Sequence, residues 1–160
     1  MSKGYSGHFS GTKGAKHGSG TIKSQQQQKA VEWAKNHRNE VSRRIYDKMN
    51  TVTVAYDESS GKYYYGKNGG IALNNSPKNP ALFGENGILP KSSLNRFPLG
   101  HCAEVDAINN ALNDGAKLSN LHIYTIGTTK KDFGTAKCAC ENCTYAFKGK
   151  VKSNNSGWRN

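Results

Sequence analysis

The sequence predicts an α/β domain in which a mixed sheet is covered by helices. Three observations support this prediction. A segment with helical periodicity precedes two alternating segments joined by a short turn, a second helix and a third strand follow, and a third helix and a short strand come last. Strands that are connected through packed helices indicate a sheet with helices on its faces.

The first half of the chain contains the first predicted helix and a hairpin. Apolar residues recur every three or four positions over residues 29–50, which predicts a helix. Residues 51–57 and 62–67 alternate in the manner of strands, and Ser59-Ser60-Gly61 supplies the turn between them. Alternation on the second strand predicts that Tyr64 lies on the opposite face from its two tyrosine neighbours.

The second half carries a long loop and the remaining elements. Residues 74–100 contain all four prolines of the chain and are expected to form an irregular segment that shapes the entrance to a site. The other predicted elements are a helix over 103–113 that stops at Asp114-Gly115, a strand over 121–126, a helix over 140–147 and a short strand over 150–153.

Composition separates the start of the chain from the rest. Residues 1–28 are rich in Gly, Ser, Thr and Lys and contain no acidic residue, so we expect a flexible basic linker before one domain over 29–160. The net charge of +12 over 160 residues favours a polyanionic partner, nucleic acid first. The alternative is a basic surface with no such partner. No segment is apolar enough to predict a membrane span, and no signal peptide is expected.

Cysteine spacing is the most specific chemical signal in the chain. Cys102 stands two residues before Glu104, and Cys140 and Cys143 form a Cys-x-x-Cys pair. A catalytic zinc site needs three protein ligands, an open position and a group that moves protons. A disulfide scaffold would spread its cysteines along the chain. A structural zinc staple or a redox pair is the alternative, but neither gives Glu104 a role.

Two neighbouring residues complicate the ligand assignment. His101 is three residues from Glu104 and shares a helix face with it, so His101 in place of Cys102 is an alternative first ligand. Cys138 has the wrong spacing to Cys143 for a ligand pair and is interpreted as a bystander.

These motifs together resemble the cytidine deaminase superfamily, and more narrowly the YwqJ-type deaminase domains of bacterial polymorphic toxins. The resemblance lies in His101-Cys102-Ala103-Glu104, the helix that follows, the strand at 121–126 and Cys140-Glu141-Asn142-Cys143, and it covers roughly residues 51–153. It implies a three-layer α/β fold with a mixed sheet of four to five strands. Ala139 stands where the family usually has Pro, and the early chain end leaves a fifth strand short or missing.

The resemblance also implies a mechanism. Cys102, Cys140 and Cys143 would bind Zn²⁺, and Glu104 would transfer protons while cytosine loses its amine and becomes uracil. His101 would line the pocket. The family context implies a toxin that a bacterium secretes as part of a larger protein. It would act in the cytoplasm of the target cell, and an acidic immunity protein would neutralise it in the producer.

The substrate prediction rests on residues near the chain end. Basic residues follow a phosphate backbone, while aromatic rings stack on bases. We expect nucleic acid, with DNA favoured over RNA through the resemblance. Alternatives are a deaminase of free cytidine or nucleotides, a deaminase of another base, and a non-catalytic zinc module that binds nucleic acid. The predicted substrate-binding residues are His101, Tyr145, Lys148, Lys150 and Lys152, and Arg159 adds to the basic tail.

Overall fold

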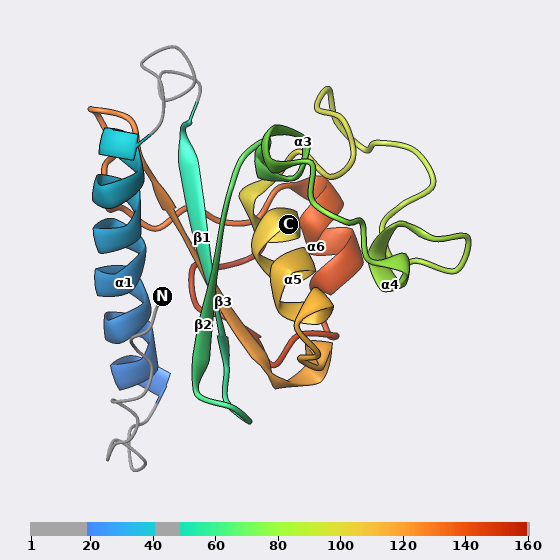
Figure 1. The fold of residues 1–160 in the computed structure, drawn as a ribbon, viewed down its shortest axis with the longest axis horizontal. Coiled ribbons are helices and arrows are strands. Elements are labelled where there is room, and N and C mark those ends of the chain that lie inside the picture. The colour runs from blue at the N-terminus through green and yellow to red at the C-terminus, as the bar shows by residue number, and fades with distance from the viewer. Residues whose placement is uncertain (1–18, 41–48, 160) are drawn as a thin grey trace.

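The computed structural model describes residues 19–40 and 49–159, which form an α/β domain with a four-stranded mixed sheet between helical layers (Figure 1). This confirms the predicted fold class. Residues 1–18 of the expected linker and 41–48 of the expected first helix lie outside the described residues. The elements are α1 (Ser19–Glu40), β1 (Thr51–Asp57), β2 (Lys62–Lys67), α3 (Gly70–Asn74), α4 (Pro80–Phe83), α5 (Ala103–Asn113), the 3-10 helix η2 (Leu118–Asn120), β3 (Leu121–Gly127), α6 (Glu141–Phe147) and β4 (Ser153–Asn154).

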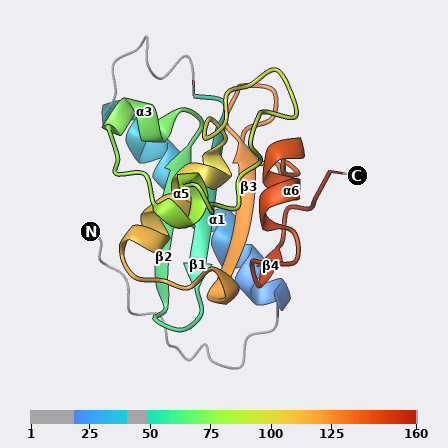
Figure 2. The ribbon, with the colours of Figure 1, turned by 90° about the vertical axis from the view of Figure 1, so that its right-hand side faces the viewer.

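The sheet has the strand order β2-β1-β3-β4. Strand β1 pairs antiparallel with β2 and with β3, whereas β3 and β4 run parallel. Figure 2 shows α5 and α6 on the near side of the sheet and α1 behind it. Each face of the sheet is thus covered by helices, and the core divides into one cluster on the α1 side and one on the α5 side.

Helix α1 begins at Ser19, ten residues before the predicted start, so the predicted helix boundary was wrong. The reason is a buried side chain within a run of glutamines, which are good helix formers. Gln26 is fully buried and donates from Nε2 to the carbonyl oxygen of His122 at 2.8 Å. Its Oε1 accepts a hydrogen bond from Asn155 Nδ2 at 2.8 Å. These bonds attach α1 to β3 and to the end of the chain.

The hairpin of β1 and β2 has the predicted bounds. Val52 and Val54 pack in the α1-side cluster, while Ala55 belongs to the α5-side cluster. Tyr64 packs against the α5-side cluster and its two tyrosine neighbours against the α1-side cluster, so the predicted alternation is confirmed.

Helix α5 lies close against the sheet because Gly66 on β2 leaves no side chain at the contact. A Cβ atom at Gly66 would lie 2.2 Å from the backbone nitrogen of Ala107 and 2.7 Å from the carbonyl oxygen of Ala103. Those two alanines and Ala111 are fully buried, and Phe147 of α6 is buried in the same cluster. Gly66 and these small side chains therefore set how closely α5 packs against the sheet.

The stretch over 74–100 is less irregular than predicted. It contains α4, where Pro80 occupies the first turn and Asn79 caps the helix by accepting a hydrogen bond from the Ala81 backbone nitrogen at 3.0 Å. Leu82 is buried in the α5-side cluster. The segment is therefore packed onto the domain along the same face as α5.

Strand β4 is shorter and later than the predicted strand over 150–153. It pairs in parallel with His122 and Ile123 of β3 and contributes two residues. The described part of the chain holds no fifth strand in this sheet. None of the helices in the described ranges is both long and apolar enough to cross a bilayer.

Gly66→Ala is expected to lower the free energy of unfolding by about 3 kcal/mol. The added methyl group meets backbone atoms of α5, which cannot move aside as a flexible side chain can. Gly61→Ala in the hairpin turn is the control. Its Cβ would meet nothing within 4 Å, and its φ of +78° leaves a backbone cost of roughly 1 kcal/mol. Urea unfolding of both variants measures the difference, and equal destabilisation would contradict the close contact.

Candidate functional site

Two helix amino-termini meet at the three predicted ligands. Cys102 is the N-cap residue of α5, and Cys140 is the N-cap residue of α6. Cys143 lies in the first turn of α6 and is fully buried. Free N–H groups and the positive end of the helix dipole stabilise thiolates at such positions. The helices predicted over 103–113 and 140–147 therefore begin at the two cysteine motifs.

The three sulfur atoms form a compact group. They lie within 4.8 Å of one another, and Cys102 Sγ is 2.8 Å from Cys140 Sγ. Hydrogen bonds from Cys102 and then Cys143 lower the pKa of the Cys140 thiol, whereas the hydrogen bond to Cys140 raises the pKa of Cys102. One negative charge is thus stabilised on a group of three sulfurs. A cation is needed before all three can be thiolates.

The three cysteines can hold a metal ion. Thiolates are soft ligands that suit zinc, and Zn–S bonds of about 2.3 Å require ligands as close together as these are. Within the described ranges the group comprises Cys102, Cys140 and Cys143, and neither His101 nor Cys138 belongs to it. The geometry therefore favours Cys102 over His101 as the first ligand. A tetrahedral ion held by these three cysteines would keep a fourth position open, as in catalytic zinc sites.

Glu104 lies beside the sulfur atoms in the first turn of α5 and is only 4% exposed. Its Oε2 accepts a hydrogen bond from Thr125 Oγ1 on β3 at 3.0 Å, and Cys143 Sγ is 3.9 Å from its Oε1. Burial raises the pKa of the carboxyl to about 7, because the hydrogen bonds oppose the shift only in part. A carboxyl with this pKa both takes up and releases protons near neutral pH.

Two threonines on neighbouring strands orient this carboxylate. Thr53 of β1 faces Thr125 of β3 in the sheet register, and their hydroxyl oxygens are 2.6 Å apart. When Glu104 is ionised, Thr125 donates to it, so Thr53 must donate to the Thr125 oxygen. The sequence did not predict this series of hydrogen bonds, because only the strand pairing brings the two threonines together.

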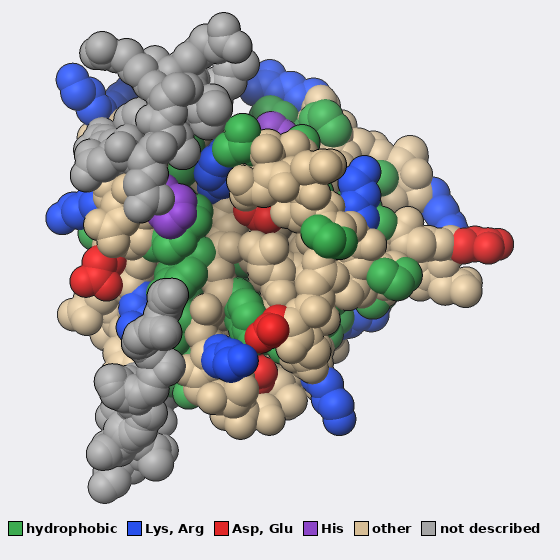
Figure 3. All heavy atoms as spheres, in the orientation of Figure 1, with side chains coloured by type: hydrophobic (Ala, Val, Ile, Leu, Met, Phe, Trp, Pro, Cys, Tyr) green, Lys and Arg blue, Asp and Glu red, His purple; other side chains and the backbone are tan. Residues whose placement is uncertain are grey.

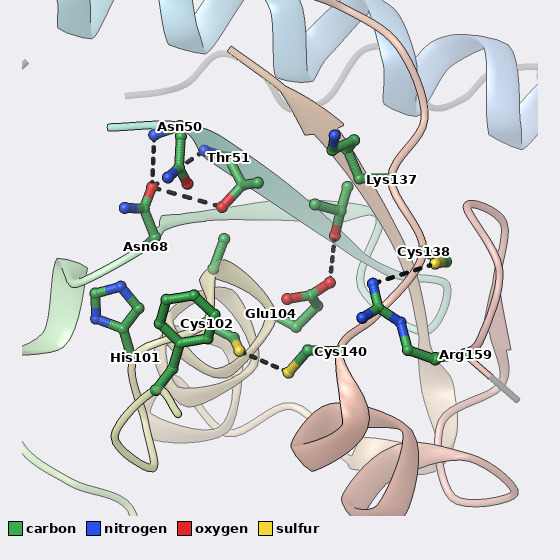
Figure 4. A pocket seen from close by; sticks show the side chains of 13 residues that line it. Asn50, Thr51, Asn68, His101, Cys102, Glu104, Lys137, Cys138, Cys140 and Arg159 are labelled. Carbon is green, nitrogen blue, oxygen red and sulfur yellow. Dashed lines mark hydrogen bonds between the residues drawn. The ribbon is translucent and has the colours of Figure 1, made fainter. Parts of the chain in front are cut away.

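A pocket of about 190 Å³ opens over these groups. Figure 4 shows Glu104, Cys102 and Cys140 near its centre, with His101 on one side and Arg159 on the other. A small planar molecule that enters the pocket would therefore meet the carboxyl and the sulfur atoms together. The lining residues are Asn50, Thr51, Asn68, Phe97, His101, Cys102, Ala103, Glu104, Thr125, Lys137, Cys138, Cys140 and Arg159.

Lys137 and Arg159 place positive charge on the wall of this pocket. Lys137 Nζ is 2.9 Å from Asp132, and the Arg159 guanidinium is 3.4 Å from Glu141 Oε2 and 3.8 Å from Cys138 Sγ. Both cationic side chains remain roughly half exposed, at 44% and 47%. They can therefore still meet an anionic group of a ligand. Sequence analysis missed Lys137, which no motif marks, and anticipated Arg159 only as part of a basic tail.

The other four predicted substrate-binding residues lie outside the pocket lining. Tyr145 is 62% exposed on α6, and Lys148 and Lys150 are exposed after the carboxyl end of that helix. Lys152 pairs with Glu58 at 3.5 Å. The pocket lies at the amino end of α6, so proximity in sequence did not bring these side chains to it. Their contact with a longer ligand stays a prediction.

The two residues inside the Cys-x-x-Cys pair tie the preceding loop to α6. Asn142 is buried and accepts a hydrogen bond from the Leu94 backbone nitrogen at 2.8 Å, and Glu141 accepts one from the same loop at 3.0 Å. The loop carries Phe97, whose ring stacks on His101 with centroids 5.7 Å apart. The helix that carries two of the sulfur atoms therefore also fixes the rim of the pocket.

No family model, curated protein or solved structure matches this chain. The function is therefore inferred from the residues of the site and their geometry. The resemblance to cytidine deaminases rests on the two cysteine motifs of the sequence.

Replacing Cys102, Cys140 or Cys143 by Ser is expected to abolish tight binding of about one zinc ion per chain, because each change removes one of three ligands. Cys138→Ser is the matched control and should keep the metal, since that thiol is exposed and outside the group. Elemental mass spectrometry after dialysis measures the metal content. Loss of zinc from Cys138→Ser, or full retention in any of the other three, would contradict the assignment.

Glu104→Gln is expected to stabilise the metal-free protein at pH 8 and to leave its stability unchanged at pH 4. The folded pKa of about 7 exceeds the unfolded value of about 4.3, so stability is lost as the pH rises between these values. The full loss is roughly 4 kcal/mol, and glutamine removes it. Urea unfolding in the presence of a chelator measures the difference. An equal effect of the substitution at both pH values would rule out the raised pKa.

Proposed function

We propose that this chain is a zinc-dependent hydrolytic deaminase that converts cytosine to uracil in nucleic acid. The observation that carries the proposal is a buried Glu104 beside three clustered cysteines in a pocket. Structural zinc sites usually close on four protein ligands. Here three ligands are accompanied by a carboxyl that is not one of them, which supports a catalytic role.

Zinc bound by the three cysteines would supply Lewis acidity that lowers the pKa of water. The overall reaction adds one water to cytosine and releases ammonia from C4. Glu104 accepts the two protons of the water one after the other, and it delivers one to the pyrimidine ring nitrogen and one to the leaving amine. The hydrogen bond from Thr125 holds Oε2 toward the sheet, while Oε1 lies on the side of Cys143. The carboxyl is therefore held in one orientation during these transfers.

The charges around the pocket support a substrate that carries phosphate. Lys137 and Arg159 line the pocket, and a free nucleoside would make no use of either. Figure 3 shows Lys and Arg side chains spread over the described part of the viewed face instead of gathered in one patch. Lys137 and Arg159 therefore indicate where a phosphate group would bind, which the net charge of +12 does not. Among nucleic acids we favour DNA because of the resemblance to toxin deaminases.

We extend the proposal to the biological role that this resemblance implies. The domain would be the toxin part of a larger protein that a bacterium secretes, and it would act in the cytoplasm of the target cell. An acidic immunity protein would protect the producer. Lys137 and Arg159 at the pocket would be complementary in charge to such an inhibitor.

The test is to incubate the zinc-loaded protein with matched single-stranded DNA, duplex DNA, RNA and free cytidine, and to detect uracil by mass spectrometry. Glu104→Gln is expected to lower the rate by about a hundredfold to ten-thousandfold while zinc stays bound, because the proton-transfer group is lost. Glu85→Gln in the long loop is the matched control, since Glu85 is exposed and lies outside the pocket lining.

Each contrary outcome points to a different alternative. Undiminished turnover by Glu104→Gln would exclude its role in proton transfer. A zinc-loaded protein that binds nucleic acid but converts none of the substrates would be a non-catalytic zinc module. Conversion of free cytidine alone would indicate a nucleoside deaminase, and Arg159→Ala would then leave the rate unchanged.

A further inference from the structure

A second hollow of about 460 Å³ lies next to the pocket that holds Glu104. His101 lines both spaces, so the two adjoin at this residue. Figure 4 shows this imidazole at the edge of the first pocket, on the side away from Arg159. The volume falls within the range of about 300–1,000 Å³ that is usual for small-molecule sites.

The position of His101 is fixed by its neighbours. Its carbonyl oxygen accepts a hydrogen bond from the Gly69 backbone nitrogen at 2.7 Å. Its ring stacks on Phe97 with an interplanar angle of 6°. Gly69 has a φ of +72°, and a Cβ built there would lie 3.8 Å from Cε1 of the imidazole, so Gly69 faces the ring. His101 is therefore held in place where the two spaces adjoin.

The lining of the second hollow combines apolar surface with polar groups. Ile71 and Phe83 supply the apolar surface, and Asn75 and Ser76 supply hydrogen-bonding groups. Lys78 also lines the hollow, with its Nζ 5.6 Å from the centroid of the Phe83 ring. A nucleobase stacks on such surfaces and is read along its edge by amides and hydroxyls, while a lysine neutralises the neighbouring phosphate.

We propose that the second hollow binds the nucleotide next to the target cytosine, with His101 between the two bases. This inference rests on the proposed function, because it assigns both spaces to one substrate strand. Consecutive bases are joined through a single sugar–phosphate unit, which suits two spaces that adjoin at one residue. Neighbouring bases in a duplex stay paired and stacked on each other. The substrate class is therefore single-stranded nucleic acid.

The test compares three single-stranded oligonucleotides that each contain one cytosine. One strand is complete, one has an abasic site on the 5′ side of the cytosine, and one has an abasic site on the 3′ side. Ala72→Trp adds bulk at an exposed position of α3 that lines the second hollow. Leu73→Trp is the matched control, because Leu73 is 41% exposed and lies outside that lining.

Turnover by the zinc-loaded wild type should fall about tenfold with one of the two abasic strands, because the neighbouring base no longer binds. On the complete strand, Ala72→Trp should turn over about tenfold more slowly than the wild type. On the abasic strand that slows the wild type, the rate of Ala72→Trp should fall no further. Leu73→Trp should match the wild type on all strands. Equal rates for the two tryptophan variants on the complete strand would overturn the proposal.

Binding of a thymidine-only single strand, followed by fluorescence anisotropy, separates this proposal from the deaminase proposal. If no cytosine is converted but Ala72→Trp binds this strand about tenfold more weakly than Leu73→Trp, the deaminase proposal fails and the second hollow stands as a single-strand site. If cytosine is converted while rates and affinities of the two variants are equal, the second hollow is not a subsite and the deaminase proposal stands.

Discussion

The site depends on holding four acidic groups close together, and two of them, Cys143 and Glu104, are buried. Three thiols within 4.8 Å of one another and a carboxyl that is 4% exposed cannot all ionise without an opposite charge. The amino-terminal ends of α5 and α6 supply part of that charge through free N–H groups and helix dipoles. A bound metal ion would supply the rest. The lowered pKa of Cys140 and the raised pKa of Glu104 express this imbalance.

Packing keeps the two helix ends at the distance that the sulfur atoms require. The absence of a side chain at Gly66 lets α5 approach β2 closely, and Phe147 anchors α6 in the same cluster. Thr125 reaches from β3 to Glu104 and thereby ties the carboxyl to the sheet. A displacement of α5 would move Cys102 away from α6 and break this bond as well. The chemistry of the site and the packing of the core therefore constrain each other.

Segments that are distant in sequence form the walls of the pocket. The loop before α5 brings Phe97, the loop after β3 brings Lys137, and the chain end brings Arg159. Loops held by a rigid scaffold are the usual carriers of binding residues. Stacked aromatic rings and cations around a buried carboxyl are complementary to a base that is attached to a phosphate. The second hollow adjoins this pocket at His101.

Local sequence determined most of the elements and the sulfur ligands, because alternation, helix stops and cysteine spacing depend on residues only a few positions apart. The tertiary structure decided what depends on distant partners. Gln26 extends α1 toward the amino-terminus through a carbonyl oxygen 96 residues away, which no local pattern contains. Chain order placed Lys148 next to the metal-site helix, but only the fold shows that the pocket lies at the opposite end of that helix from this lysine. Lys137 joins the site for the same reason, since burial and strand pairing, which act across the whole chain, decide which side chains meet.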